Sequence, residues 1–158
     1  MHDATALRYS WGFTRPERLL SDRQFLLALI AGCSISFVAG ALAGEYVTSE
    51  TGFLVVAFFI FVVPLCEEIV FRGVVQNYFG RNTAGVQYPA RLSPANLITS
   101  LLFTLSHLVY NANLFAWLAF FPGLVFGYFR ERYNSLLPGI ILHSAFNSAL
   151  ISGWYLST

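Results

Sequence analysis

The sequence predicts an all-α, polytopic membrane protein with about five transmembrane helices around a buried polar site. Three observations carry this prediction: few charges, long apolar runs, and arginines confined to alternate polar links. Of the 158 residues, 56% are hydrophobic and only 11% are charged, whereas a soluble domain typically carries about 25% charged residues. The net charge of +1 gives no reason to expect a nucleic acid as a partner.

The apolar runs predict the helices in order along the chain. The first run, residues 24–44, carries no charge over about twenty residues, the length that spans ~30 Å of hydrocarbon. The second run, residues 53–79, is apolar except for three charged residues near its middle. The other runs are residues 95–110, 114–129 and 135–156, and the polar links are residues 45–52, 80–94, 111–113 and 130–134.

The arginines predict the orientation of the spans. With five spans, every arginine outside the apolar runs falls on one side of the membrane, and these are Arg8, Arg15, Arg18, Arg23, Arg81, Arg91, Arg130 and Arg132. Cytoplasmic links carry an excess of basic residues, so we expect the N-terminus in the cytoplasm and the C-terminus outside. The chain then consists of a cytoplasmic N-terminal segment, residues 1–23, and a transmembrane domain, residues 24–158, with its core at residues 53–156.

Small residues recur on one face of the first run, at Gly32, Ser36, Gly40 and Gly44. Such a face lets two helices approach closely. We expect this contact to lie within the protein, with dimerisation as the alternative, and the sequence leaves the oligomeric state open.

Two other motifs near these runs have alternative interpretations. Ala41-Leu42-Ala43 resembles the cleavage site of a signal peptide, although the apolar run exceeds the ~7–15 residues usual there. Cys66, like Cys33, lies in an apolar run and is expected to pack as a small hydrophobe. A nucleophilic role for Cys66 is the alternative, because it directly precedes the carboxylate pair.

Five ionisable residues remain inside the apolar runs: Glu67, Glu68, Arg72, His107 and His143. A charge at the centre of a bilayer costs about 2.5–3.5 kcal/mol on insertion scales. The five residues belong to three of the expected helices, so a shared interior cluster is the arrangement that satisfies them.

Helical spacing assigns partners within this cluster. Glu68 and Arg72 are four residues apart and are expected to form an ion pair on one helix face. Glu67 points about 100° away, with His107 as its expected partner. His143 and Asn147 are also four residues apart and project together. Pro64 removes a backbone hydrogen bond and is expected to kink its helix.

The cluster has the groups needed for the attack of water on an amide carbonyl. A carboxylate beside an imidazole can deprotonate water, and an imidazole with a side-chain amide can stabilise an oxyanion. Three alternatives stand beside this interpretation: a structural ion-pair network, a zinc site formed by glutamate and histidines, and a proton or ion pathway. Zinc is disfavoured because the helical H-E-x-x-H motif is absent and an adjacent arginine opposes a cation.

Three ordered motifs resemble a known family. Glu67-Glu68-x-x-x-Arg72, Phe103-x-x-x-His107 and His143-x-x-x-Asn147 are similar to the signature of the CAAX protease and bacteriocin-processing (CPBP, or Abi) family, which includes the type II CAAX prenyl endopeptidases. The resemblance covers residues 64–147.

The resemblance implies an intramembrane endopeptidase of the glutamic type that requires no cofactor. By this resemblance, Glu67 would activate water with the help of His107, and His143 and Asn147 would form the oxyanion hole. Glu68, Arg72 and Phe103 would support the site.

The resemblance also suggests a short prokaryotic member in the inner membrane, because the chain lacks the additional helices of the prenyl endopeptidases. Members of the myxosortase type trim C-terminal membrane anchors, and others act in bacteriocin maturation or immunity. The expected partners are membrane lipid and a membrane-anchored protein or peptide substrate, whose C-terminus is processed or sorted. A non-catalytic membrane-binding or immunity protein, or a zinc-dependent protease, are the alternatives.

Overall fold

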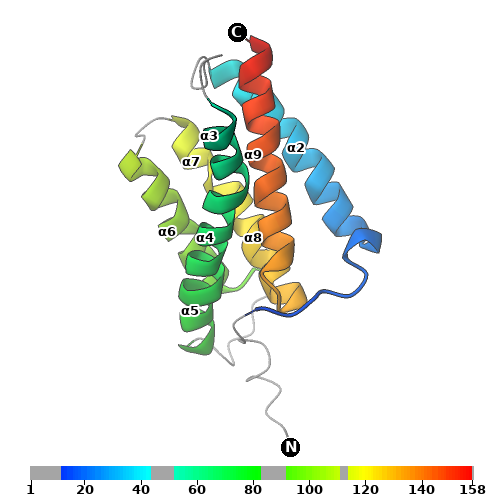
Figure 1. Ribbon diagram of the computed structural model, residues 1–158. Helices are drawn as coiled ribbons and strands as arrows, with labels where there is room; N and C mark the ends of the chain where they lie inside the picture. Colours follow the sequence, from blue (N-terminus) through cyan, green and yellow to red (C-terminus); the bar gives the residue numbers. More distant parts are fainter. Residues whose placement is uncertain (1–11, 44–51, 83–91, 111–113, 158) are drawn as a thin grey trace, which may run out of the picture. The chain divides into compact units, whose positions relative to one another are not determined.

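The computed structural model describes residues 12–43, 52–82, 92–110 and 114–157, and every regular element within these ranges is a helix (Figure 1). The segments η2 and η3 are π-helical and η1 is a 3-10 turn. The elements are η1 (Leu19–Ser21), α2 (Arg23–Ala43), α3 (Phe53–Ala57), η2 (Phe58–Val62), α4 (Val63–Glu68), η3 (Ile69–Val75), α5 (Gln76–Asn82), α6 (Pro94–Tyr110), α7 (Leu114–Leu118), α8 (Phe120–Tyr133) and α9 (Leu137–Ser157). The prediction of an all-α fold is confirmed for these residues.

Local chemistry explains where several helices begin and end. Asp22 caps α2 by accepting a hydrogen bond from the Gln24 amide at 2.8 Å, and Ser93 caps α6 by accepting one from the Asn96 amide at 3.0 Å. Pro94 follows at the first helical position, where its missing N–H costs nothing. Asn134 ends α8 in the left-handed conformation, with φ of 48°.

The fourth predicted run differs from the expectation of one helix, because α7 and α8 are separate elements. Pro122 lies in the first turn of α8 and lacks the N–H that would bond to the Leu118 carbonyl. Helix α7 therefore ends at Leu118, and α8 starts at Phe120 and continues through the expected polar link to Tyr133.

The chain divides into two compact units, and we describe each by itself. The first unit comprises Met1–Glu17 and Glu67–Gly139, and the second comprises Arg18–Cys66 and Ile140–Thr158. In the first unit α6 packs against both α8 and α5. Gly12, which lies in an irregular segment, is bound to the link before α9, since the Leu136 amide donates to the Gly12 carbonyl at 2.8 Å.

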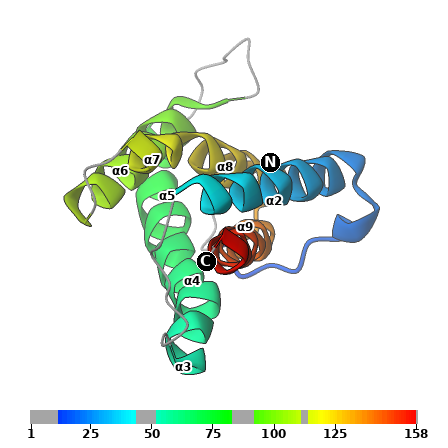
Figure 2. The same cartoon turned by 90° about the horizontal axis from the view of Figure 1, so that it is seen from above.

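In the second unit α2 and α9 lie side by side (Figures 1 and 2). A Cβ added to Gly40 would lie 2.1 Å from the Leu150 carbonyl oxygen, and one added to Gly153 would lie 2.1 Å from the Phe37 carbonyl oxygen. Only glycine permits backbones to approach this closely. The predicted close packing of the small-residue face is thus confirmed at Gly32 and Gly40, whereas Gly44 lies outside the described residues.

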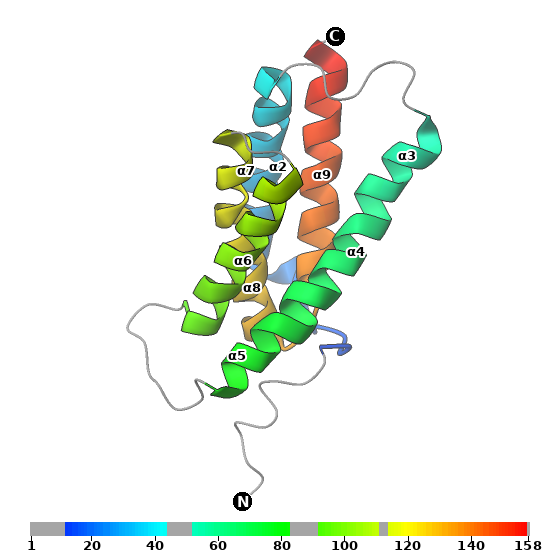
Figure 3. The same cartoon turned by 90° about the vertical axis from the view of Figure 1, so that its left-hand side faces the viewer.

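Two helices of the described residues are long and apolar enough to cross a membrane: Arg23–Leu42, and the continuous helix Phe53–Asn82 that contains α3 to α5 (Figure 3). Helix α6 is apolar but shorter. Helix α9 has 21 residues, but His143, Asn147 and its serines lower its hydropathy. The count of five spans therefore stays a prediction.

Candidate functional site

A buried ion pair lies at the centre of the first unit. Arg72 Nη1 is 3.1 Å from Glu68 Oε1, and both side chains are 0% exposed. The pair that was predicted from the four-residue spacing is therefore confirmed. A buried charge is tolerated only when it is paired, so each of these residues makes the other possible in an apolar environment.

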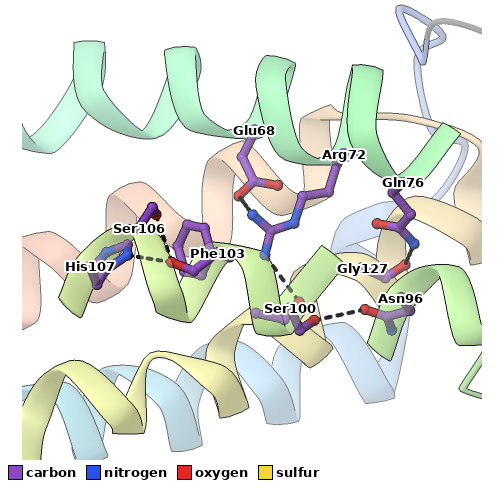
Figure 4. A network of polar contacts seen from close by, with 10 residues as sticks. Glu68, Arg72, Gln76, Asn96, Ser100, Phe103, Ser106, His107 and Gly127 are labelled. Atoms are coloured by element: carbon purple, nitrogen blue, oxygen red, sulfur yellow. Dashed lines mark hydrogen bonds and ion pairs between the residues drawn. The ribbon is translucent and has the colours of Figure 1, made fainter. Parts of the chain in front are cut away.

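Arg72 also ties its helix to two others (Figure 4). Its Nη2 donates to the Gly123 carbonyl of α8 at 3.1 Å, and its guanidinium lies 4.4 Å from the ring centroid of Phe103 on α6. Phe103 is 2% exposed. The predicted supporting residues Glu68, Arg72 and Phe103 thus form one contiguous group.

The backbone approaches this group closely at the start of α9. A Cβ added to Gly139 would lie 2.5 Å from Glu68 Oε2. Any side chain at this position would therefore displace the carboxylate of the ion pair.

His107 is held by Phe103, one turn earlier on α6. The two ring centroids are 4.5 Å apart, and His107 Nδ1 lies 2.9 Å from the Phe103 carbonyl oxygen. A carbonyl oxygen only accepts hydrogen bonds, so Nδ1 carries the proton in this contact. In the neutral ring Nε2 is then the acceptor, which is the state that suits a base or a water-binding group.

Glu67 differs from its neighbour Glu68 in its surroundings. Glu68 is fully buried, whereas Glu67 is half-buried. Arg72 is attracted electrostatically by both carboxylates. Glu67 is therefore the more exposed of the two adjacent glutamates.

His143 and Asn147 belong to the second unit, on one face of α9. His143 is 5% exposed, and Asn147 Nδ2 donates to the Phe59 carbonyl of η2 at 3.0 Å. The structure thus groups five predicted residues in the first unit and two in the second. That the two sets meet around one water molecule stays a prediction.

A set of buried polar residues on α5 and α6 was missed from the sequence. Gln76 Nε2 donates to the Gly127 carbonyl at 3.0 Å and to Glu131 Oε1 at 2.8 Å. Asn96 Nδ2 donates to the Leu124 carbonyl at 3.0 Å, and the Ser100 hydroxyl donates to Asn96 Oδ1 at 3.1 Å (Figure 4). The four-residue recurrence of Asn96, Ser100 and Thr104 within an apolar run is the signal that predicts such a face.

The chain matches the model of a known protein family. The family model described as type II CAAX prenyl endopeptidase, Rce1-like, matches residues 49–149 of the chain. This range is more than half of the chain and contains all seven predicted site residues. No curated protein and no solved structure matches the chain.

Proposed function

Because this chain belongs to the family of Rce1-like type II CAAX prenyl endopeptidases, we propose that it is an intramembrane endopeptidase of the glutamic type. The family is membrane-integral and acts on membrane-associated proteins. The proposed reaction is the hydrolysis of a peptide bond in a protein or peptide held in the bilayer. It requires no metal ion or cofactor.

The different surroundings of the two adjacent carboxylates, Glu67 and Glu68, support this proposal. Glu68 is fully buried and paired with Arg72 at 3.1 Å, so its negative charge is neutralised by the guanidinium. Glu67 is half-buried on another face of the same helix. A general base must reach the water that it deprotonates, and of the two carboxylates Glu67 meets this condition better.

The contacts of His107 support its role as the partner of Glu67. Its Nδ1–H is bound to the Phe103 carbonyl, which leaves Nε2 to accept a hydrogen bond from water. Glu67 and His107 lie in the same unit. The ring of Phe103 is in turn packed against the Arg72 guanidinium. The imidazole is thus oriented by a residue that belongs to the buried ion-pair group.

We propose the following reaction sequence. Glu67 takes a proton from water, assisted by His107, and the water oxygen attacks the carbonyl carbon of the scissile bond. His143 and Asn147 donate hydrogen bonds to the oxyanion that forms. The proton held by Glu67 then passes to the amide nitrogen as the C–N bond breaks, which yields a carboxylic acid and an amine.

The proposal extends to topology and substrate. The alternating arginines favour five spans with the N-terminus in the cytoplasm. The proposed location is a prokaryotic inner membrane, and the proposed substrate is a C-terminally anchored protein or peptide that is processed or sorted by removal of its anchor.

Cleavage by the purified full-length chain tests the proposal. Two probes in detergent micelles are compared by mass spectrometry: a farnesylated CAAX peptide, and an unprenylated peptide with one apolar segment and a short arginine-containing tail. We expect Glu67→Gln and His107→Ala to lower kcat/KM by at least about 100-fold without changing the thermal unfolding midpoint by more than a few degrees.

Cys66→Ser is the matched control, because it changes the residue next to Glu67 on the same helix. We expect it to retain activity, and we expect a chelator to leave the wild type unaffected. Full activity of Glu67→Gln would refute the proposal. Loss of activity on chelation would instead indicate zinc-dependent hydrolysis, and a folded chain that cleaves neither probe would favour the non-catalytic alternative.

A further inference from the structure

Pro64 interrupts the backbone hydrogen bonds of its helix at a defined carbonyl. In the π-helical segment η2 the Val63 amide donates to the Phe58 carbonyl, five residues earlier. The next donor in this register would be the amide of residue 64, and its acceptor would be Phe59. Proline has no N–H, so the Phe59 carbonyl cannot receive this bond.

The side chain of Asn147 supplies a donor to this same carbonyl. Asn147 Nδ2 lies 3.0 Å from the Phe59 oxygen, and Asn147, Phe59 and Pro64 all belong to the second unit. A carbonyl oxygen only accepts, so the NH₂ end of the carboxamide must face it. Polar side chains commonly satisfy the backbone groups that proline releases within membrane helices.

This contact also orients the rest of the carboxamide. The amide nitrogen carries two N–H groups in one plane. When one is bound to the Phe59 carbonyl, the direction of the second is fixed relative to α9. A preorganised donor of this kind is what an oxyanion hole needs, because it requires no reorientation during the reaction.

We propose that Pro64 is a positioning residue for Asn147. By withholding an N–H from the Phe59 carbonyl, it leaves that carbonyl to bind the Asn147 amide, which then presents its second N–H in a fixed direction. The catalytic part of this inference rests on the proposed role of Asn147 in the oxyanion hole, whereas the hydrogen-bonding part does not.

A double-mutant cycle on the full-length protein tests the hydrogen-bonding part. Pro64→Ala restores an amide donor to the helix. The Phe59 carbonyl then receives a backbone N–H from position 64 in the π register or from Val63 in the α register. Asn147→Leu removes the side-chain donor but keeps the volume of the side chain. We expect Asn147→Leu to lower the thermal unfolding midpoint by about 2–4 °C more in the wild type than in the Pro64→Ala chain.

Cleavage kinetics with the farnesylated or the unprenylated peptide test the catalytic part. We expect Pro64→Ala to lower kcat about tenfold with little change in KM, and to cause no further loss in the Asn147→Leu chain. Pro138→Ala, a change of another buried proline in the first turn of α9, is the control and should show no coupling to Asn147 in either measurement.

The two measurements separate the possible failures. Equal losses of thermal stability in both backgrounds would overturn the inference, whatever the activity. Additive losses of kcat would overturn its catalytic part, since they would mean that Pro64 acts independently of Asn147. If the wild type cleaves neither peptide, the proposed function fails, and the thermal cycle alone still decides whether Pro64 positions the amide.

Discussion

The contacts that join α5, α6 and α8 in the first unit differ from those that join α2 and α9 in the second unit. In the first unit side chains form the links between helices, because Arg72 binds the Gly123 carbonyl at 3.1 Å and Gln76 binds the Gly127 carbonyl at 3.0 Å. In the second unit α2 and α9 meet through their backbones at Gly40 and Gly153. Among the described residues, every buried polar or charged side chain except His143 belongs to the first unit.

This difference shows two solutions to one physical problem. Apolar side chains gain little by leaving lipid for a protein interior, so the hydrophobic effect does not hold membrane helices together. Close packing at small residues is one alternative, and hydrogen bonds between buried polar groups are the other. The unit with the polar links is also the one that contains Glu67 and His107, two of the proposed catalytic residues.

The largest effect is expected from breaking the ion pair of the first unit. Glu68→Leu leaves the Arg72 charge buried without its carboxylate, which should cost about 3–5 kcal/mol of unfolding free energy. Thermal unfolding of the detergent-solubilised protein measures this cost. The double variant Glu68→Leu with Arg72→Met should be more stable than Glu68→Leu alone, because no buried charge then remains.

Glu17→Gln is the control, since Glu17 is exposed, and it should leave the midpoint unchanged. A Glu68→Leu chain as stable as the wild type would show that the pair contributes nothing to holding the unit.

An intermediate effect is expected at the glycine contact of the second unit. Gly40→Ala places a methyl group 2.1 Å from the Leu150 carbonyl oxygen, and overpacking of this kind costs about 1–3 kcal/mol. Ala31→Leu adds more volume at an exposed position of the same helix and should be tolerated. Equal stability of the two variants would argue against backbone contact as the basis of this unit.

The smallest effect is expected from removing one polar link of the first unit. Gln76→Met keeps the length of the side chain but loses the bonds to the Gly127 carbonyl and to Glu131, at a cost of about 1–2 kcal/mol. Asn82→Ala on the same helix removes an exposed amide that donates to the Tyr78 carbonyl of its own helix and should cost almost nothing. If both changes lower the free energy of unfolding equally, the buried hydrogen bonds stabilise this unit no more than an exposed one does.

Much of the helical layout follows from the order of the residues. Residues 24–44 and 53–79 were expected as long helices, and α2 and the continuous helix Phe53–Asn82 correspond to them within a few residues. The Glu68–Arg72 pair also followed from spacing, because a helix brings residues four apart onto one face. These features depend on residues that are close together in the chain, so the spacing of residues in the sequence predicts them directly.

Other features were not predictable in this way. The separation of α7 from α8 at Pro122 was not predicted, because the hydropathy of residues 114–129 is that of one continuous apolar run. The contact between the Arg72 guanidinium and the Phe103 ring joins residues from different helices. Spacing within one segment does not predict which helices pack together. Asn147 was expected in an oxyanion hole, and its bond to the Phe59 carbonyl was not foreseen.

By itself the sequence determined the helical class, the positions of the apolar segments, the membership of the family, and the local pairing of Glu68 with Arg72. Each of these depends on composition or on spacing within a single segment. Only the tertiary structure decided which carboxylate is buried, which carbonyl orients His107, and which donor replaces the missing N–H of Pro64. Those outcomes depend on contacts between residues distant in the chain, since burial and hydrogen-bond partners are set by the neighbouring helices and not by adjacent residues.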